Sequence, residues 1–433
     1  MSWFTLDGGF AQFVFDYVFY YPFLMAYFWM GGGIAHALFF ERKRHEYIDP
    51  LTLLPETPLV SVIVPCYNES RGVRDVIEQL MRTRYPAFEV IAVNDGSKDK
   101  TGEILDELAA TYSKVRVIHH AKNQGKAVGL NTAALLARGE YILGIDGDAL
   151  VDRDAIAWLL VPMMRSPKVG AVTGNPRIRT RTTLIGRMQV GEFSSTIGLI
   201  KRTQQLMGRL FTVSGVLAMF RRKALLDAGF WSPDVMAEDI DVSWKVQLAG
   251  WRVRFEPRAI SWILMPETIR GLYRQRQRWA VGGVQTLIRH TREVWKPRNV
   301  PMWPIYIEYV ASVFWAYAML FVLTVAIIRY VFPTDWGQVG FWPEWHGMLL
   351  GLTCMLQMAV SLWIDRHYDR HIMRYFMWTI WYPFAFWTIN MVTSVLAIPI
   401  TIMRRRGKRA VWNSPDRGVI YDRRKTDRPA QSD

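Results

Sequence analysis

The sequence predicts a doubly wound α/β domain with a mostly parallel sheet, inserted between transmembrane helices. The first observation is the distribution of apolar residues: the 433-residue chain is 51% hydrophobic and 14% aromatic, and its long apolar runs lie toward its two ends. The second is the polar stretch between them, where short apolar segments alternate with helical ones. Such alternation is typical of parallel strands joined by helices. The composition excludes a disordered chain, a collagen and a small disulfide-linked fold.

Four apolar runs contain no Asp, Glu, Lys or Arg and are candidates to span a membrane: 17–40, 309–328, 347–364 and 375–403. A span needs about 20 mostly apolar residues, so the third run is close to the minimum length. The last run is longer than one crossing requires, and Pro383 and Pro399 could divide it into re-entrant or interfacial pieces.

Basic residues beside these runs predict the orientation of the chain, which has a net charge of +15. Residues 42–44 are all basic and follow the first run, so we expect the N-terminus outside and the polar stretch in the cytosol. The tail from residue 404 carries ten Lys and Arg against four Asp, which favours the cytosolic side, whereas three crossings before it would leave it outside. We expect these basic residues to contact the lipid bilayer. We find no basic motif of the kind that recognises bases in a nucleic-acid groove.

Within the polar stretch the sequence predicts four strands and three helices. The first strand, 59–65, is a continuous apolar and β-branched run, as expected for a strand that is buried on both faces. The other strands are predicted at 90–93, 115–118 and 141–145, and the helices at 71–84, 100–112 and 126–138.

Polar side chains follow three of these strands, at the sheet edge where doubly wound folds bind ligands. Tyr67 and Glu69 follow the first strand, Asp95 the second, and Asp146 and Asp148 the fourth. Two carboxylates in one turn suit a divalent cation, since Mg²⁺ is held by one or two carboxylates together with substrate phosphates. The alternative for Asp146-Gly147-Asp148 is a solvated turn, because Asp and Gly are common in turns.

Further acidic positions have both a structural and a chemical interpretation. Asp95 could accept hydrogen bonds from a base or a ribose, or it could cap the helix that begins near Lys100. Glu238 and Asp239 lie at a predicted helix start, where negative charge is favourable. A carboxylate beside an acceptor hydroxyl could equally act as a general base.

A basic amphipathic segment, 268–290, is predicted to form a helix at the membrane face of the polar domain. On a helix, Gln275, Arg278 and Trp279 share one face. Arginine offers a planar fork to phosphate, and tryptophan stacks on a sugar ring or a cation. The alternative is a helix that binds lipid headgroups, and the two roles are compatible.

Taken in order, Asp95, Asp146-Gly147-Asp148, Glu238-Asp239 and Gln275 with Arg278-Trp279 resemble the signature of the processive family 2 glycosyltransferases, which include cellulose, chitin and hyaluronan synthases. Other segments resemble the branch of this family that makes β-1,6-linked poly-N-acetylglucosamine: 172–181, 189–195, 263–268 and 412–418. The resemblance implies a GT-A-type domain in a multi-pass protein of the bacterial inner membrane. It also implies that a biofilm exopolysaccharide is made from UDP-N-acetylglucosamine with inversion at the anomeric carbon.

The resemblance also implies a role for each matching residue. Asp239 would be the general base, while Glu238 and Trp279 would contact the acceptor sugar. Asp146 and Asp148 would hold Mg²⁺ or Mn²⁺. The residues implied in binding the UDP-sugar are Pro65, Tyr67, Glu69, Asp95, Asp146, Asp148, Gln275 and Arg278.

The implied organisation has five parts: a membrane anchor (1–45), a cytosolic GT-A domain (58–266), interface helices (267–300), a C-terminal transmembrane region (301–403) and a basic tail (404–433). The implied partners are UDP-N-acetylglucosamine, the growing polysaccharide, the bilayer, and a small membrane subunit with activation by cyclic di-GMP. Three alternatives stay open: a synthase of the chitin or hyaluronan type, a lipid-linked enzyme that transfers a single sugar, and a membrane conduit without activity. The complete set of carboxylates disfavours the last.

Overall fold

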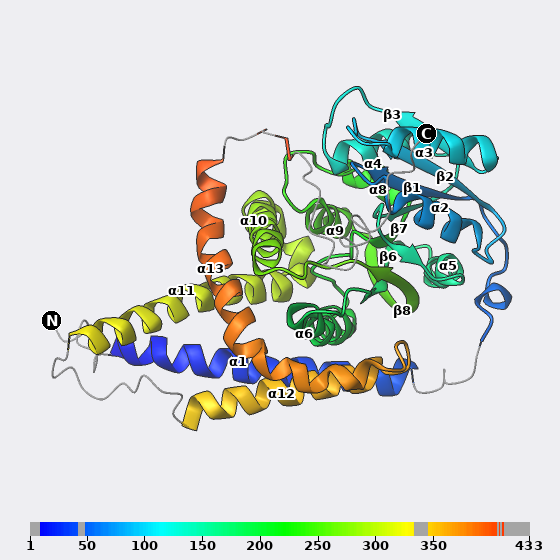
Figure 1. Cartoon of the computed structure of the whole chain (residues 1–433). Coiled ribbons are helices and arrows are strands. Elements are labelled where there is room, and N and C mark those ends of the chain that lie inside the picture. Colours follow the sequence, from blue (N-terminus) through cyan, green and yellow to red (C-terminus); the bar gives the residue numbers. More distant parts are fainter. Residues whose placement is uncertain (1–8, 42–47, 333–344, 405–406, 408, 411–433) are drawn as a thin grey trace.

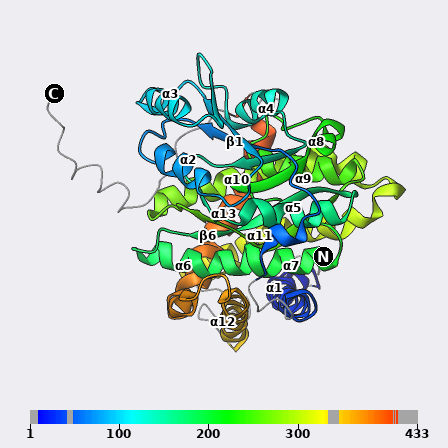
Figure 2. The ribbon, with the colours of Figure 1, turned by 90° about the vertical axis from the view of Figure 1, so that its right-hand side faces the viewer.

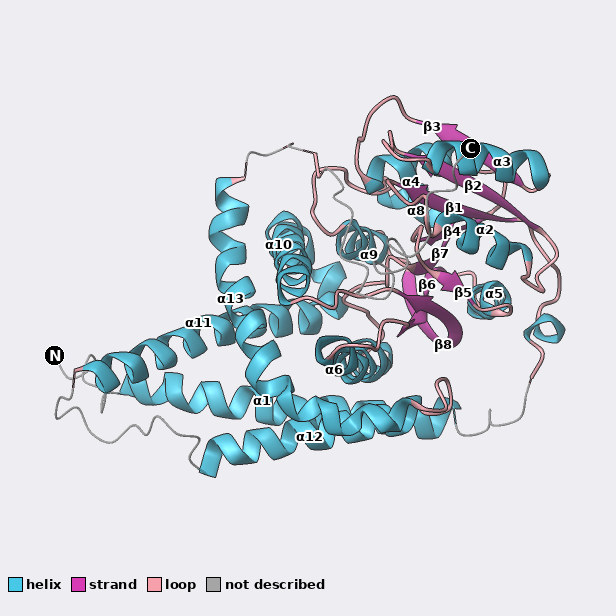
Figure 3. Ribbon diagram, viewed as in Figure 1, coloured by secondary structure: helices cyan, strands magenta, loops and turns pink. Residues whose placement is uncertain are grey.

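A computed structural model describes residues 9–41, 48–332, 345–404, 407 and 409–410. An α/β domain lies at one end of a group of long helices (Figures 1 and 3). The chain forms one long helix, then the α/β domain, and then the remaining long helices. The domain is therefore inserted between the long apolar helices, as the sequence predicts.

The first half of the sheet is parallel and follows the predicted alternation. Strand β1 (Val60–Cys66) lies between β2 (Phe88–Asn94) and β4 (Tyr141–Ile145), and β3 (Val115–His119) pairs with β2. The connecting helices are α2 (Val73–Met81), α3 (Thr101–Thr111) and α4 (Lys126–Leu136). A short 3₁₀ helix, η4 (Pro50–Leu53), precedes β1.

The second half of the sheet departs from a parallel, doubly wound arrangement. The complete strand order is β3-β2-β1-β4-β7-β6-β8-β5. Strand β7 (Leu217–Arg221) is antiparallel to β4 and to β6 (Val169–Ile178), β8 (Arg252–Ile263) is parallel to β6, and β5 (Leu150–Val151) is antiparallel to β8. The helices of this half are α5 (Ala155–Arg165), α8 (Arg222–Ala228) and α9 (Glu238–Leu248).

Two apolar cores lie on the two faces of the sheet. Val62 of β1 belongs to one core, together with Leu105 of α3. The next residue, Ile63, belongs to the other core, together with Ala133 of α4 and Val246 of α9. Successive side chains of a strand point to opposite faces, so a strand covered on both sides reads as a continuous apolar run.

Four helices of the described chain are long and apolar enough to cross a membrane, which identifies a membrane protein. The first is α1 (Gly9–His36), which continues into the π-helical turn η2 (Ala37–Glu41). The others are α11 (Trp303–Val331) after the 3₁₀ helix η6 (Pro297–Met302), α12 (Trp345–Asp365), and the 3₁₀ helix η7 (Ile372–Trp381) joined to α13 (Tyr382–Met403). The short run at 347–364 thus lies in a helix of 21 residues.

The last apolar run is divided into two pieces. The 3₁₀ helix η7 ends at Trp381, and Pro383 occupies the first turn of α13, where a proline is well tolerated. Helices α1, α11 and α12 run alongside one another, whereas α13 crosses their direction and runs beside α10 (Ile269–Val294) (Figure 1). The four apolar runs therefore do not form four parallel crossings.

The start of the tail lies against the α/β domain. The Ala410 amide donates a hydrogen bond of 2.9 Å to the Pro233 carbonyl, and Arg409 Nη1 donates one of 2.9 Å to Gln124 Oε1. The tail thus begins on the same side of the long helices as the α/β domain, in agreement with its basic composition. The basic cluster at 42–44, the loop at 333–344 and the segment 411–433 lie outside the described residues.

A rod of three consecutive helices joins the α/β domain to α1 and α12 (Figure 2). It consists of α6 (Leu184–Phe193), the π-helix η5 (Ser194–Ile200) and α7 (Lys201–Leu206). A Cβ on Gly32 of α1 would lie 2.2 Å from Thr203 Cγ2, so only glycine permits this approach. At the centre, the fully buried guanidinium of Arg202 lies 2.7 Å from Glu41 Oε1 and 2.8 Å from Asp365 Oδ1. A buried charge network therefore fixes the domain to two of the long helices.

Candidate active site

Carboxylates from two distant parts of the sequence lie around one lysine at the carboxyl edge of the sheet. Lys126, the first residue of α4, places Nζ 2.5 Å from Asp146 Oδ1 and 3.1 Å from Glu238 Oε1. Asp239 follows at the start of α9, and its Oδ2 lies 3.2 Å from where a Cβ on Gly215 would stand. Lys126 Nζ lies 3.3 Å from the same point. We call Lys126, Asp146, Glu238 and Asp239 the acidic cluster.

Burial and neighbouring charges set the protonation of the acidic cluster. Burial raises the pKa of Asp239 above its ordinary value, and the Glu238 carboxylate raises it further. Burial also raises the pKa of Asp146, although Lys126 opposes this shift. Burial alone would raise the pKa of Glu238, but the charges of Lys126 and Arg278 hold it below its ordinary value. A carboxylate of raised pKa beside an ionised partner is the arrangement expected of a general base.

Lys126 is not among the site residues predicted from the sequence, although its position at the start of a helix is unusual for a lysine. A cation at the first position of a helix is electrostatically unfavourable, and Lys126 stands there directly after Gly125, whose φ is +96°. Burial would lower the pKa of its ammonium group, but Asp146 and Glu238 raise it well above the ordinary value. The lysine is therefore permanently charged and holds two acids together.

A second buried lysine, from the rod of helices, contacts the loop that lies beside Asp239. Lys201 Nζ donates a hydrogen bond of 2.7 Å to Ser214 Oγ, and Ser214 directly precedes Gly215 beside Asp239. Burial lowers the pKa of Lys201 to about 7, against the effect of the Asp239 charge. The rod of helices that packs against α1 and α12 therefore also contacts the loop beside Asp239.

The Asp146-Gly147-Asp148 turn lies against the loop that follows β1. A Cβ on Gly147 would lie 3.2 Å from the Pro65 carbonyl oxygen and 3.3 Å from Glu69 Cγ, so the missing side chain permits this close contact. Glu69 is buried, and Tyr67 is half-buried. The structure thus places the predicted residues of the first and fourth strand loops side by side.

Asp146 and Asp148 fit a divalent cation whose coordination is completed by a substrate. Burial raises the pKa of Asp146, and the charge of Asp148 adds to this shift, so a cation between them would be favourable. Within the described part of the chain, no cluster of three or more Asp, Glu, His or Cys residues could hold a metal ion. Diphosphate and water oxygens would therefore supply the remaining ligands, as is common for Mg²⁺.

Asp95 is fully buried, and the chain itself satisfies its carboxylate. Its oxygens accept hydrogen bonds from the amides of Gln124 and Gly125, at 3.0 and 2.8 Å, and lie 2.8 Å from His120 Nδ1. The aspartate that bonds to the start of α3 is Asp99, whose Oδ1 accepts a hydrogen bond of 3.1 Å from the Thr101 amide. Asp95 therefore does not cap α3 and instead fixes the loop that leads into α4.

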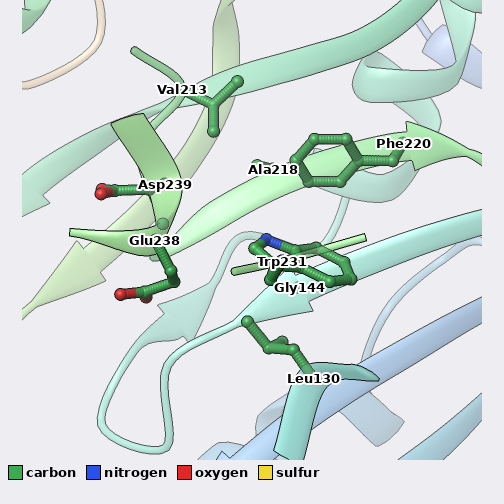
Figure 4. A pocket seen from close by; sticks show the side chains of 9 residues that line it. Leu130, Gly144, Val213, Ala218, Phe220, Trp231, Glu238 and Asp239 are labelled. Atoms are coloured by element: carbon green, nitrogen blue, oxygen red, sulfur yellow. The ribbon is translucent and has the colours of Figure 1, made fainter. Parts of the chain in front are cut away.

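A narrow apolar pocket lies behind the two acids of α9 (Figure 4). Ala218 and Phe220 of β7 line it together with Trp231. The carboxylates of Glu238 and Asp239 point away from the two aromatic rings. Apolar packing on this side excludes water from the carboxylates, which is why burial shifts their pKa values.

Helix α10 places its three expected residues in different environments. Gln275 and Trp279 are half-buried, whereas Arg278 is exposed. The charge of Arg278 nevertheless lowers the pKa of Glu238, so this arginine lies near the acidic cluster. Trp279 packs on the apolar residues around Met265.

Arg276 is the buried residue among Gln275, Arg276, Arg278 and Trp279. Its structural role could not be predicted from the sequence. Its Nη2 lies 2.5 Å from Glu192 Oε2 of α6, a partner 84 residues earlier in the chain. Its guanidinium stands 4.3 Å from the Trp279 ring, and its Nη1 donates a hydrogen bond of 3.4 Å to Gln275 Oε1. One buried ion pair therefore orients both Gln275 and Trp279.

Known proteins resemble the chain in sequence and in fold. Residues 61–228 match the family described as "Glycosyl transferase family 2". The chain is 34% identical to the poly-beta-1,6-N-acetyl-D-glucosamine synthase of Staphylococcus epidermidis, over 94% of this chain and 99% of that protein. It is also 34% identical to the protein of the same name from Staphylococcus aureus (strain COL), over 93% and 98%. A solved structure, "Mannosyltransferase PcManGT from Pyrobaculum calidifontis in complex with GDP-Man and Mn2+", has a TM-score of 0.59 at 22% identity, covering 88% of this chain and 99% of that chain. The likeness between these two structures shows a shared GT-A fold.

Proposed function

Because the chain belongs to the poly-β-1,6-N-acetyl-D-glucosamine synthase family, within glycosyl transferase family 2, we propose that it polymerises N-acetylglucosamine from UDP-N-acetylglucosamine into a β-1,6-linked exopolysaccharide and moves the product across the membrane. The observation that carries this proposal is the acidic cluster at the sheet edge, which places Asp239 of raised pKa beside ionised Glu238 and Lys126.

Donor binding follows from the position of the strand loops. The nucleoside would lie against the loops after β1 and β2, because the first of these borders the Asp146-Gly147-Asp148 turn and its Asn68 amide donates a hydrogen bond to Ser97 Oγ of the second. The diphosphate would lie between that turn and α10, where Arg278 is available to it. The proposed donor-binding residues are Pro65, Tyr67, Glu69, Asp95, Asp146, Asp148, Gln275 and Arg278. Asp95 is buried and already bonded to Gln124, Gly125 and His120, so it would contribute by fixing the loop before α4.

Asp239 is the proposed general base. It takes the proton from the 6-hydroxyl at the non-reducing end of the growing chain, and that oxygen forms a bond to C1 of the donor sugar. The bond between C1 and the diphosphate oxygen breaks, and its electron pair leaves with UDP, so an α-linked donor gives a β-linked product. Glu238 and Trp279 would position the acceptor sugar.

A divalent cation, Mg²⁺ or Mn²⁺, held by Asp146 and Asp148 would neutralise the charge that develops on the departing diphosphate. A chelator is expected to abolish release of UDP, and added Mn²⁺ or Mg²⁺ to restore it. Asp148→Asn is expected to raise the metal concentration for half-maximal activity at least about 10-fold, since even groups that only support a metal ligand have effects of this size. The matched control is Asp152→Asn, on the far side of the short strand β5 and before α5. Full activity in the chelator, or equal metal dependence of the two variants, would contradict the metal site.

The product identifies the reaction most directly. Membranes that contain the full chain are incubated with labelled UDP-N-acetylglucosamine, and the product is digested with a β-1,6-specific glucosaminidase. We expect a long product that this enzyme degrades. A polymer that resists it would indicate a chitin or hyaluronan type of linkage, a single sugar on lipid would indicate a non-processive enzyme, and no release of UDP would indicate a conduit.

Glu192→Gln tests the ion pair that orients the α10 residues. The neutral amide holds Arg276 more weakly, so Gln275 and Trp279 lose their fixed positions, and we expect kcat/KM to fall by up to about 10²-fold. Steady-state UDP release measures this effect. Glu293→Gln is the matched control. Glu293 lies at the exposed end of α10, where its Oε1 is 2.5 Å from Lys296 Nζ. Equal kinetics of the two variants would show that the Glu192–Arg276 ion pair does not position Gln275 and Trp279.

The proposed location is the bacterial inner membrane with the α/β domain in the cytosol, on the side where the basic tail begins. The proposed partners are the nucleotide sugar, the growing polysaccharide, the bilayer and a small membrane subunit through which cyclic di-GMP activates the enzyme. Exposed aromatic side chains of α11, among them Phe314 and Phe321, offer a surface for a helix of such a subunit.

A further inference from the structure

A pocket of about 480 Å³ opens where the α/β domain meets the ends of two long helices. Its walls come from the end of α1 and η2, the loop after α7, strand β8 and the 3₁₀ helix η6 before α11. It shares no lining residue with the acidic cluster. The donor and acceptor sites proposed above therefore do not account for it.

Three arginines line this pocket: Arg209, Arg252 and Arg254. Burial lowers the pKa of Arg209 and of Arg254, and in both cases the charge of Arg252 lowers it further, so Arg252 lies within electrostatic reach of each of the other two. In the described ranges, none of the three forms an ion pair with a carboxylate. Arg209 Nη1 donates to the Trp251 carbonyl at 3.1 Å, but its buried Nε has no hydrogen-bond partner among the described residues.

Such a group of cations is unfavourable without an anion. Each guanidinium is a planar donor that matches the oxygens of phosphate, and clustered arginines are the usual means of binding it. Positive charges held together by the fold repel one another, and a bound phosphate would remove this repulsion. The three arginines therefore indicate that the ligand of this pocket carries a phosphate group.

The pocket also has apolar lining residues, and it lies where two helices that could span a membrane end on the side of the α/β domain. Phe40 lies in the last turn of the first long helix, Leu206 is the last residue of α7, and Met207 follows it; all three line the pocket and are exposed. Pro301 lies just before α11, the second long apolar helix. A ligand here would place its phosphate on the arginines and an apolar portion on these side chains.

We propose that this pocket binds the phosphodiester headgroup of an anionic phospholipid, with its acyl chains against Phe40, Leu206 and Met207. The bound lipid joins the end of α1, the loop after α7 and β8. Because Lys201 and Arg202 lie on α7, the lipid supports the end of the rod that contacts both the long helices and the Ser214 loop.

Native mass spectrometry of the detergent-solubilised full chain, titrated with short-chain phosphatidylglycerol, tests the proposal. One cation near an anionic headgroup contributes roughly five-fold in affinity, so Arg252→Gln/Arg254→Gln is expected to bind the lipid about 30-fold more weakly. The matched control is Arg82→Gln/Arg138→Gln, which removes two exposed arginines elsewhere on the α/β domain and is expected to bind like the unaltered chain. Phosphatidylcholine, which has the same phosphodiester but no net charge, is expected to bind weakly to every form.

The unfolding temperature in detergent shows whether each variant is folded. If the double variant does not fold, Arg252→Gln alone, at an exposed position, is expected to lose about five-fold. Equal binding by the pocket and control variants would overturn the proposal. Inorganic phosphate and cyclic di-GMP serve as soluble competitors. Tighter binding of either one, lost in the Arg252→Gln/Arg254→Gln variant, would overturn the lipid assignment and identify a soluble phosphate ligand.

Discussion

Asp239→Asn is expected to reduce polymer synthesis by about 10²–10⁴-fold while binding of UDP is nearly unchanged, because the amide keeps the shape of the side chain but cannot accept the acceptor proton. Polymer formation is measured with labelled UDP-N-acetylglucosamine, and UDP affinity is measured by calorimetry. The matched control is Asp241→Asn on the same helix, whose carboxylate bonds to Ser232 and His290 away from the acidic cluster. It is expected to affect stability more than the ratio of synthesis to binding. Full synthesis by Asp239→Asn would remove the base assignment.

The pH profile provides a second readout of the same variant. A general base acts in its ionised form, and burial together with Glu238 raises the pKa of Asp239. The kcat/KM of the unaltered chain should therefore fall, as pH decreases, at a higher pH than an ordinary aspartate would give. The residual activity of Asp239→Asn should lack this acidic limb, since the titrating group has been removed. An unchanged limb would assign it to another group.

Arg202→Met is expected to lower the free energy of unfolding by about 3–5 kcal/mol, because it removes a cation from a buried network and leaves Glu41 without its main partner. Asp365 is affected less, since Arg177 Nη2 lies 2.7 Å from its Oδ2. Thermal and denaturant unfolding in detergent measure the effect. Adding Glu41→Gln is expected to restore part of the loss, because the uncompensated carboxylate is then neutral.

The control for this prediction is an ion pair of the same type on the surface. Arg74 Nη2 lies 2.5 Å from Glu107 Oε2, and the two side chains are 40% and 61% exposed. Arg74→Met should cost no more than about 1 kcal/mol, because water and salt screen such pairs. Similar losses in the two variants would show that the Arg202 network does not fix the domain to α1 and α12.

The parallel half of the sheet could be predicted from the sequence because strands that are buried on both faces are mostly apolar, even though β1 contains Ser61 and β2 contains Glu89. The run at 59–65 became β1, and the strands predicted after it became β2, β3 and β4 in their expected order. The second half was not readable. Strand β7 is antiparallel to both of its neighbours. The sequence of a short apolar segment such as 217–221 does not indicate whether neighbouring strands run parallel or antiparallel to it.

The acids of the site were also readable, since loops at the carboxyl ends of parallel strands meet at one edge. The structure places Asp95 directly after β2 and Asp146 directly after β4, as that rule requires. The rule does not cover Glu238, which lies at the start of α9 and meets Asp146 through Lys126. The sequence could not pair Lys126 with these acids or Arg276 with Glu192, because the partners lie far apart in the chain. It could not place α13 across the other long helices either.

By itself, the sequence determined which segments are apolar enough to be buried or to span a membrane, and which acids lie at the ends of strands. These properties depend on composition and spacing within one segment. Only the tertiary structure decided which cation neutralises each buried acid, in which direction the later strands run, and on which side of the long helices the tail begins. A buried charge must be compensated by whatever group the fold brings within reach, and a chain with 53 Lys and Arg offers too many candidates for the sequence to select one.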